Sequence, residues 1–552
     1  MRGSIDANFV VCVPQVQGFG YGGTNAHAIL DDAYHFLEQR NLSGLHFTAI
    51  SSGAGKDYSQ HGFARKPSTK QDTLDGIKRD RVFVINSQDQ DGLKRQRGSL
   101  ADFLESQIPV NNEEALLRDL SFTLSEKRSQ LEWRTYEIAS SIDGLILCLR
   151  DETTANPAVR RSPSPRIGFV FTGQGSQWAG MGIDLLEYTV FRESIEQADL
   201  YLRDHLKSGW SIVEELLRDE ADSRIDMSSY SQPICTALQI AMVDLLESWN
   251  IIPSAMVGHS SGEIAGAYCL GALSKEDALV AAFYRGLLSE SIKARAPGLE
   301  GGMLAVGTSE SEIRTWIEKF TGVNLGIACV NSPSSVTLSG DVRAIDEMEQ
   351  MLKHTDTFAR RLKVANAYHS SHMDVIAEPY VQSMNNLRVL PGRGDRRMHS
   401  SVTGESIDWS ELGALNWVRN LVSPVLFYDA LLDLLRPTDT NGRRTKQNAV
   451  DILLEVGPHA TLSSAVKETM NVHNIKNVKY LSVLSRKRNG IRTALGAAGS
   501  LLVEGVPVRM MRVNNFADGA RYGQLWPLID LPTYSWNHTR TYWRRVAALQ
   551  AA

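Results

Sequence analysis

The chain has 552 residues, of which 43% are hydrophobic and 22% are charged, and it carries a formal net charge of −5. This composition predicts a soluble globular protein of roughly three or four domains, and it gives no electrostatic reason to expect nucleic acid or a membrane as a partner. The five cysteines are far apart and form no C-x-x-C pair, which argues against a disulfide framework and against a zinc site. We therefore expect a cytoplasmic protein that holds no metal.

The first segment, residues 1–40, contains a glycine-rich stretch from Gln17 to Leu30. This stretch resembles the C-terminal motif of ketosynthase domains, in which the equivalent of His27 works with an upstream cysteine and a second histidine. Neither of those motifs occurs in this chain, so we predict a ketosynthase remnant without condensation activity. Residues 1–15 depart from the ketosynthase pattern, which favours the hypothesis of a truncated or misassembled gene model.

The next two segments are predicted to be a flexible linker and a small domain. Residues 41–80 are rich in Ser, Gly, Lys and Asp and lack apolar periodicity, which favours a linker. Residues 81–165 combine strand, helix and apolar patterns, at 82–85, 92–106, 116–124 and 145–149. With its Ser125-Glu126-Lys127-Arg128 and Trp133-Arg134, this region resembles the small α/β linker domain that joins ketosynthase to acyltransferase domains.

Residues 166–510 are predicted to form the main domain. They begin with the strand pattern 167–171 and then alternate helices with strands, which indicates an α/β fold with a parallel sheet. Within them, residues about 302–365 show the order β-α-β-β-α-β, which is ferredoxin-like. We expect an active site in the cleft between these two lobes. Residues 511–552 contain Trp526-Pro527-Leu528-Ile529-Asp530-Leu531-Pro532-Thr533-Tyr534-Ser535-Trp536-Asn537-His538, and with it they resemble the linker that follows acyltransferase domains.

Ser260 is the candidate nucleophile. It stands in Gly258-His259-Ser260-Ser261-Gly262, between a strand pattern and a helix pattern, which is typical of a nucleophile elbow. Serine needs a base such as a neutral histidine within hydrogen-bond reach. We expect the backbone N–H groups of Ser261 and Gln174, the latter in a glycine-rich loop, to form an oxyanion hole. The elbow alone also permits a serine hydrolase or thioesterase.

Together the motifs resemble those of the malonyl/acyl-CoA:acyl carrier protein transacylase family, and most closely the acyltransferase domain of type I iterative polyketide synthases of the fungal reducing type. The motifs follow the family's order: Gly173-Gln174-Gly175-Ser176-Gln177, Gly258-His259-Ser260-Ser261-Gly262-Glu263, Phe283-Tyr284-Arg285-Gly286, Cys329-Val330-Asn331-Ser332-Pro333, Ala367-Tyr368-His369-Ser370 and Glu455-Val456-Gly457-Pro458-His459. The resemblance implies an α/β-hydrolase-like lobe with a parallel sheet and an inserted ferredoxin-like subdomain, preceded by a small α/β linker domain.

The resemblance also implies residue roles. His369 is the expected base, although His372 is a rival at helical spacing. In the family a backbone carbonyl orients this histidine, and we expect that support from residues 455–458, because no carboxylate completes a triad. Asn331 and His259 are expected at the substrate-binding pocket, His259 in a mainly structural role.

Arg285 and Tyr368 predict which acyl group enters. Arg285 lies in an apolar helical pattern, where an unpaired guanidinium would be costly and a carboxylate partner would relieve that cost. A malonyl group supplies such a carboxylate; a solvated arginine or an internal salt bridge with Glu290 is the alternative. Tyr368 occupies the position where malonyl-selecting members of the family tend to carry a bulky aromatic, so we expect it to exclude an α-methyl group.

The predicted function is transfer of a malonyl group from malonyl-CoA, through a malonyl-Ser260 ester, to the phosphopantetheine thiol of an acyl carrier protein. No bound cofactor is expected, and the expected partners are the carrier protein and other polyketide synthase domains, such as ketosynthase and dehydratase. The chain contains no Asp-Ser-Leu carrier motif, so the carrier must lie elsewhere. An inactive fragment that acts only as a docking module is a third hypothesis.

Overall fold

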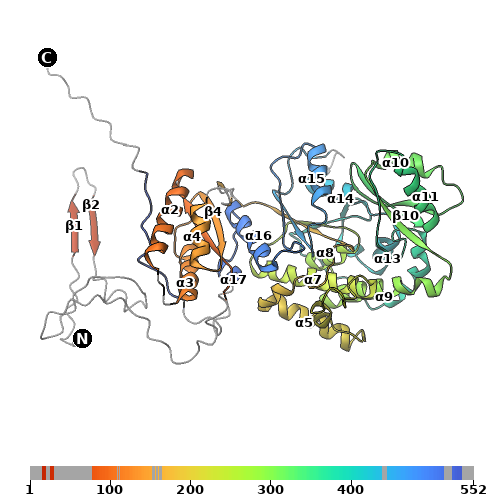
Figure 1. Cartoon of the computed structure of the whole chain (residues 1–552), viewed down its shortest axis with the longest axis horizontal. Helices are drawn as coiled ribbons and strands as arrows, with labels where there is room; N and C mark the ends of the chain where they lie inside the picture. Colours follow the sequence, from red (N-terminus) through yellow and green to blue (C-terminus); the bar gives the residue numbers. More distant parts are fainter. Residues whose placement is uncertain are drawn as a thin grey trace, which may run out of the picture. The chain divides into compact units, whose positions relative to one another are not determined.

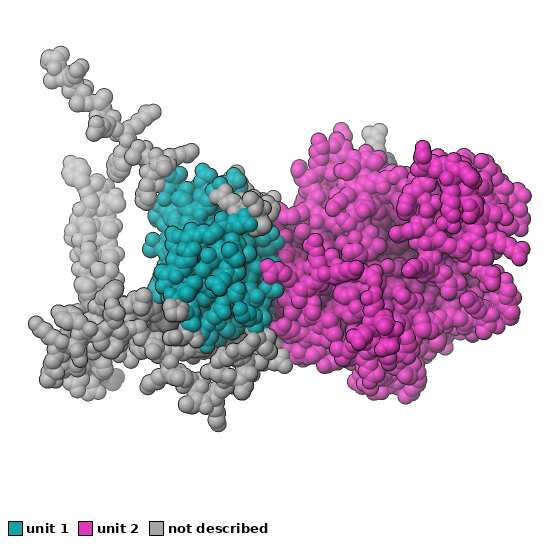
Figure 2. All heavy atoms as spheres, viewed as in Figure 1, with its two compact units in different colours: residues 1–161, 510–552 teal, residues 162–509 magenta. Residues whose placement is uncertain are grey.

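The computed structural model describes residues 78–537, except 109, 111, 152–155, 157–158, 161–163, 438–443 and 515–524. It also describes the backbone of two antiparallel strands, β1 (Gln15–Phe19) and β2 (Asn25–Ile29), on which the ketosynthase-like stretch falls. The rest of the predicted remnant and almost all of the predicted 41–80 linker lie outside the described residues. The chain divides into two compact units, residues 1–161 with 510–552 and residues 162–509 (Figure 2).

The smaller unit is built on an antiparallel sheet in the order β3-β4-β5. Its elements are β3 (Arg81–Ser87), α2 (Gln90–Ser106), α3 (Glu113–Glu126), β4 (Trp133–Ala139), α4 (Ile142–Arg150), β5 (Val159–Arg160) and α17 (Met510–Val513). The apolar run at 145–149 lies in α4, which packs Leu145 and Leu149 into the core with Phe83 of β3. Strand β4 has no expected counterpart in the sequence, because most of its residues are buried and it lacks the alternation of a half-exposed strand.

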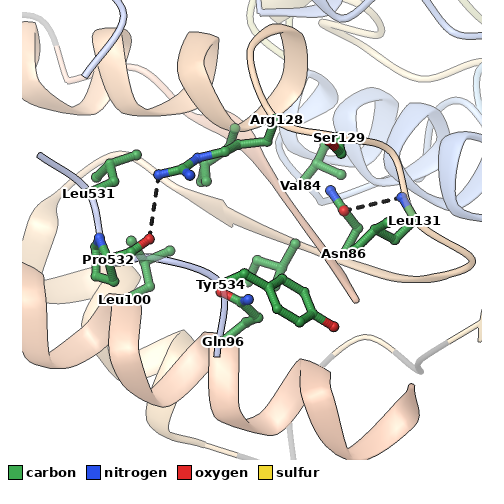
Figure 3. A pocket seen from close by; sticks show the side chains of 12 residues that line it. Val84, Asn86, Gln96, Leu100, Arg128, Ser129, Leu131, Leu531, Pro532 and Tyr534 are labelled. Atoms are coloured by element: carbon green, nitrogen blue, oxygen red, sulfur yellow. Dashed lines mark hydrogen bonds between the residues drawn. The ribbon is translucent and has the colours of Figure 1, made fainter. Parts of the chain in front are cut away.

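The segment 525–537 packs against this smaller unit. Leu531 joins the unit's hydrophobic core, and the Tyr534 hydroxyl lies 2.9 Å from the Ser87 hydroxyl and accepts a hydrogen bond from the backbone of Gln88. Between the segment and the sheet lies a cavity of about 160 Å³, where Arg128 donates to the carbonyl of Pro532 (Figure 3). This segment therefore contributes to the core of a unit whose sheet and three longer helices lie some 400 residues earlier in the chain.

The larger unit contains a six-stranded sheet in the order β13-β12-β7-β6-β14-β15. All neighbouring pairs are parallel except β12 with β13. The central strands β6, β7 and β14 are buried along their whole length, as expected for a parallel sheet covered on both faces. The strands are β6 (Ile167–Phe171), β7 (Ala255–Gly258), β12 (Arg397–Ser400), β13 (Glu405–Ile407), β14 (Ile452–Val456) and β15 (Lys479–Ser482).

Helices account for most of the rest of the larger unit, and α5, α7 and α9 pack against one another (Figure 1). They are α5 (Thr189–Asp204), α6 (Ile212–Leu216), α7 (Ser228–Ser248), α8 (Gly262–Leu270), α9 (Lys275–Arg295), α12 (Ala377–Ser383), α13 (Ala414–Val422), α14 (Phe427–Leu435), α15 (Ser463–Val472) and α16 (Gly490–Glu504). Three short 3-10 helices are η1 (Ile183–Glu187), η2 (Ser371–Ile376) and η3 (Trp409–Glu411). Within the described part of the chain, no helix combines the length and apolarity needed to cross a bilayer.

A ferredoxin-like subdomain interrupts the larger unit, as predicted. Its elements follow the order β8 (Gly301–Val306), α10 (Glu310–Ile317), β9 (Leu325–Ser332), β10 (Ser335–Asp341), α11 (Val342–Lys353) and β11 (Ala359–Arg361). The antiparallel sheet has the order β11-β8-β10-β9, so the fourth strand lies beside the first and the third beside the second. The predicted fold class is thereby confirmed.

The register of the large sheet brings three loops together. Phe171 of β6 pairs with Gly258 of β7 and with Val456 of β14, and each of these residues is the last of its strand. Because parallel strands end at the same edge, the loops that follow them lie side by side. These are the glycine-rich loop, the serine turn and the loop after β14.

Candidate active site

The serine turn is a strained connection between β7 and α8. Ser260 has a φ of 53°, a left-handed conformation that non-glycine residues adopt at a cost. A side chain at Gly258 would place its Cβ 2.4 Å from the backbone nitrogen of Glu263, and one at Gly262 would place it 2.5 Å from the carbonyl oxygen of Phe171. Both glycines are therefore required by the close approach of backbone, and the turn directs Ser260 toward the cavity between the lobes.

His369 lies within hydrogen-bond reach of this serine. Its Nε2 is 2.8 Å from Ser260 Oγ, and its Nδ1 is 2.9 Å from the carbonyl oxygen of Ser423. Since a carbonyl only accepts, Nδ1 carries the proton and Nε2 is free to accept from the serine. The expectation that residues 455–458 orient this ring is wrong: the loop that follows α13 does so. The rival His372 bonds to Asp341 instead, at 2.8 Å.

The surroundings of His369 keep it neutral. Burial lowers its pKa to about 3, and the positive charge of Arg285 and the nearby His259 act in the same direction. The hydrogen bond to the Ser423 carbonyl opposes this shift but does not overcome it. Near neutral pH the ring is therefore in the form that can accept a proton.

Arg285 projects from α9 into the same site. The residue is 1% exposed; one terminal nitrogen of its guanidinium donates to Ser260 Oγ at 3.2 Å and the other to Asn420 Oδ1 at 2.9 Å. Among the described residues no carboxylate forms an ion pair with it, and Glu290 instead accepts from the backbone of Ser229. Burial lowers the pKa of Arg285, although arginine stays protonated at neutral pH. The site thus holds a buried positive charge beside the serine hydroxyl.

Two backbone N–H groups flank the serine. Ser261 follows it at the start of α8, and the glycine-rich loop lies against the turn so closely that a Cβ at Gly173 would be 2.5 Å from the carbonyl of His259. Among the residues that the structure describes, no protein acceptor receives a hydrogen bond from the N–H of Gln174 or of Ser261. Both donors are therefore available to an oxygen bound at the serine.

Tyr368, His259 and Asn331 form walls of the site. The hydroxyl of Tyr368 lies 2.7 Å from that of Ser228, which also accepts from the side chain of Gln174 at 3.3 Å. His259 Nε2 lies 2.8 Å from Asn331 Oδ1, and burial lowers the pKa of this histidine. His259 is thus engaged with Asn331 and makes no hydrogen bond to the serine hydroxyl.

All the predicted site residues except Ser261 line one cavity of about 300 Å³. The larger lobe contributes the serine turn, the glycine-rich loop, Arg285 and residues 461–465, and the ferredoxin-like subdomain contributes residues from β8 to just beyond β11. The cavity therefore lies between the two lobes.

Sequence reasoning missed three groups that support the site. Asn420 and Ser423 lie at and just beyond the end of α13 and contact Arg285 and His369, respectively. Glu263 is fully buried at the start of α8, accepts hydrogen bonds from Ser400 and Ser401, and has its pKa raised to about 7 by burial. Glu263 closes the serine motif, but its role could not be read from that motif, and no motif marked Asn420 or Ser423, because the partners of all three residues lie more than fifty residues away in the chain.

The motif at residues 455–458, which was expected to orient His369, holds a different buried carboxyl, Glu455. Its Oε1 accepts from the backbone N–H of Leu462 at 3.0 Å, and burial raises its pKa to about 8. Leu462 lines the cavity. Glu455 therefore supports the shape of the cavity wall and does not contact the histidine.

Comparison with known proteins agrees with this geometry. Residues 168–508 match the family described as the acyl transferase domain. The chain is 42% identical over 567 residues to the highly reducing polyketide synthase dmxL2 of Cryptosporiopsis sp. (strain 8999), covering 96% of this chain and 23% of that protein. It is 41% identical over 586 residues to the partially reducing polyketide synthase men1 of Menisporopsis theobromae, covering 96% and 22%. The chain thus spans less than a quarter of the length of these relatives.

Solved structures give the same result. The crystal structure of the acyltransferase domain from module 8 of the salinomycin polyketide synthase superimposes with a TM-score of 0.67 at 27% identity, covering 78% of this chain and 98% of that one. The match to the family covers most of the larger lobe with its serine turn and the whole ferredoxin-like subdomain. The chain belongs to the acyl transferase domain family, and within it the chain resembles the acyltransferase domains of polyketide synthases.

Proposed function

We propose that this chain transfers a malonyl group from malonyl-CoA to the phosphopantetheine thiol of an acyl carrier protein, with Ser260 as nucleophile and His369 as base. The proposal rests on one observation above all: the buried Arg285 guanidinium lies 3.2 Å from Ser260 Oγ without a carboxylate partner among the described residues. A buried cation is costly unless an anion pairs with it. An acyl group with a free carboxylate supplies that anion, and water or a simple acyl group does not.

In the first half-reaction His369 Nε2 accepts the proton of Ser260 as Oγ attacks the thioester carbon of malonyl-CoA. The carbonyl oxygen becomes an oxyanion that accepts hydrogen bonds from the N–H groups of Gln174 and Ser261. One such donor typically lowers the barrier by about 3 kcal/mol. The carbon–sulfur bond then breaks, His369 protonates the departing thiolate of CoA, and the malonyl group remains as an ester on Ser260.

The second half-reaction runs the same steps in reverse with a different thiol. His369 accepts the proton of the phosphopantetheine thiol, the sulfur attacks the ester carbon, and Ser260 leaves with the proton returned by His369. The carrier protein and the ketosynthase and dehydratase domains are proposed partners, since the relatives named above are much longer polyketide synthases. Tyr368 is proposed to favour malonyl over methylmalonyl by its bulk.

The test is to incubate the purified chain with malonyl-CoA and to measure its intact mass and the CoA released. A malonyl adduct that is lost in Ser260→Ala and weakened in Arg285→Ala, together with transfer to an added holo carrier protein, is the expected result. Release of CoA without an adduct would instead indicate a hydrolase. Neither adduct nor release from folded protein would indicate an inactive docking module.

A further inference from the structure

Arg285 donates its side-chain hydrogen bonds to two uncharged side chains, Ser260 and Asn420. One terminal nitrogen of the guanidinium donates to the amide oxygen of Asn420 at 2.9 Å. A carboxylate in the place of this amide would form an ion pair and bind the guanidinium more strongly. A carboxylate there would neutralise the cation and compete with an anionic acyl group. An amide holds the guanidinium in place without pairing it directly with a carboxylate.

Asn420 can present only its oxygen to Arg285. Its Nδ2 donates to the backbone carbonyl of Ser260 at 3.1 Å and to Glu263 Oε2 at 3.3 Å. The carbonyl only accepts and the guanidinium of Arg285 only donates, so the two together fix the direction of the amide. Rotating the amide by 180° would place its NH2 against the guanidinium and its oxygen against the carboxyl of Glu263. The side chain is 2% exposed, so water cannot satisfy the lost bonds.

Glu263 is in turn held by the larger lobe. It accepts hydrogen bonds from the hydroxyls of Ser400 and Ser401 and from the backbone N–H of Ser401, at the end of β12. A chain of contacts therefore runs from the edge of the sheet through Glu263 and Asn420 to Arg285. Each member is buried, and each contact has a defined donor and acceptor.

We propose that Asn420, fixed by Glu263, is a positioning residue that holds Arg285 beside Ser260 as a cation without a direct carboxylate partner among the described residues, and thereby sets the preference for acyl groups that carry a carboxylate. This inference rests on the proposed function, because it assigns the origin of selectivity at the same site. Asn420 acts through Arg285 and does not itself contact the acyl group. Glu263 acts one step further away, by setting the direction of the amide.

The test compares malonyl-CoA with acetyl-CoA in single-turnover loading of Ser260, followed by intact mass, for the wild type, Asn420→Asp and Asn420→Ala. Aspartate keeps the size of the side chain but pairs with Arg285, and alanine releases the guanidinium. With either variant we expect the ratio of malonyl to acetyl loading rates to fall at least about tenfold, as for loss of a charge-assisted hydrogen bond. If one of the two Asn420 variants does not fold, the loading ratio of the other variant tests the proposal.

Asn416→Ala is the matched control. Asn416 lies one turn earlier on α13, is also buried, and among the described residues its side-chain amide has no hydrogen-bond partner. Its loss should leave the loading ratio within about twofold of the wild type. Equal losses with both substrates in the Asn420 variants, or an unchanged ratio, would overturn the inference. Failure of the wild type to load malonyl at all would instead refute the proposed function.

Discussion

The low pKa of His369 predicts how the loading of Ser260 depends on pH. A histidine with the ordinary pKa of 6.5 would be only about 3% neutral at pH 5, so a reaction that needs it as base would slow about 30-fold between pH 8 and pH 5. Burial lowers the pKa of His369 to about 3. Because the shift is downward, the neutral form persists as the pH falls, and the rate should drop less than about twofold over that range.

The assay is rapid-quench formation of the acyl-serine at saturating malonyl-CoA from pH 5 to pH 8, with circular dichroism at each pH to verify folding. Glu263 lies next to the serine turn and also titrates in this range, since burial raises its pKa to about 7. The same pH series is measured for Glu263→Gln. If a step in the loading rate near pH 7 disappears in this variant, the step is assigned to the Glu263 carboxyl. An acid limb with an apparent pKa between 6 and 7 that persists in Glu263→Gln would refute the reasoning about His369.

Three further predictions concern single side chains. Gly262→Ala should abolish loading and lower the melting temperature, because its Cβ would lie 2.5 Å from a backbone carbonyl; Gly266→Ala on the same helix, whose nearest contact is 3.5 Å, should do neither. Leu531→Ala should destabilise the smaller unit by about 2–5 kcal/mol in urea denaturation, since Leu531 is 6% exposed and lies in its core, whereas Ile529→Ala, at 43% exposure, should change stability by less than about 0.5 kcal/mol. Tyr368→Ser should raise methylmalonyl relative to malonyl loading by about 10-fold or more, and Tyr368→Phe should not; equal ratios in the two variants would exclude bulk at this position as the selector.

Local sequence patterns predicted most of the architecture. The serine turn could be predicted because two glycines, a strand pattern and a helix pattern are contiguous, and a backbone turn of this kind depends on nearby residues alone. The ferredoxin-like order could be predicted for the same reason, since each of its elements has its own periodicity. Strand β4 could not, because a strand buried on both faces shows no alternation.

Local sequence patterns did not predict the long-range contacts. The sequence by itself singled out Ser260, His369 and Arg285 as candidate site residues, because each stands in a recognisable local pattern or family motif. Only the tertiary structure decided that Ser423 orients His369, that Asn420 holds Arg285 and that Glu263 directs Asn420. The physical reason is that a hydrogen bond depends on distance and direction in space, and these pairs are separated by 54, 135 and 157 residues along the chain.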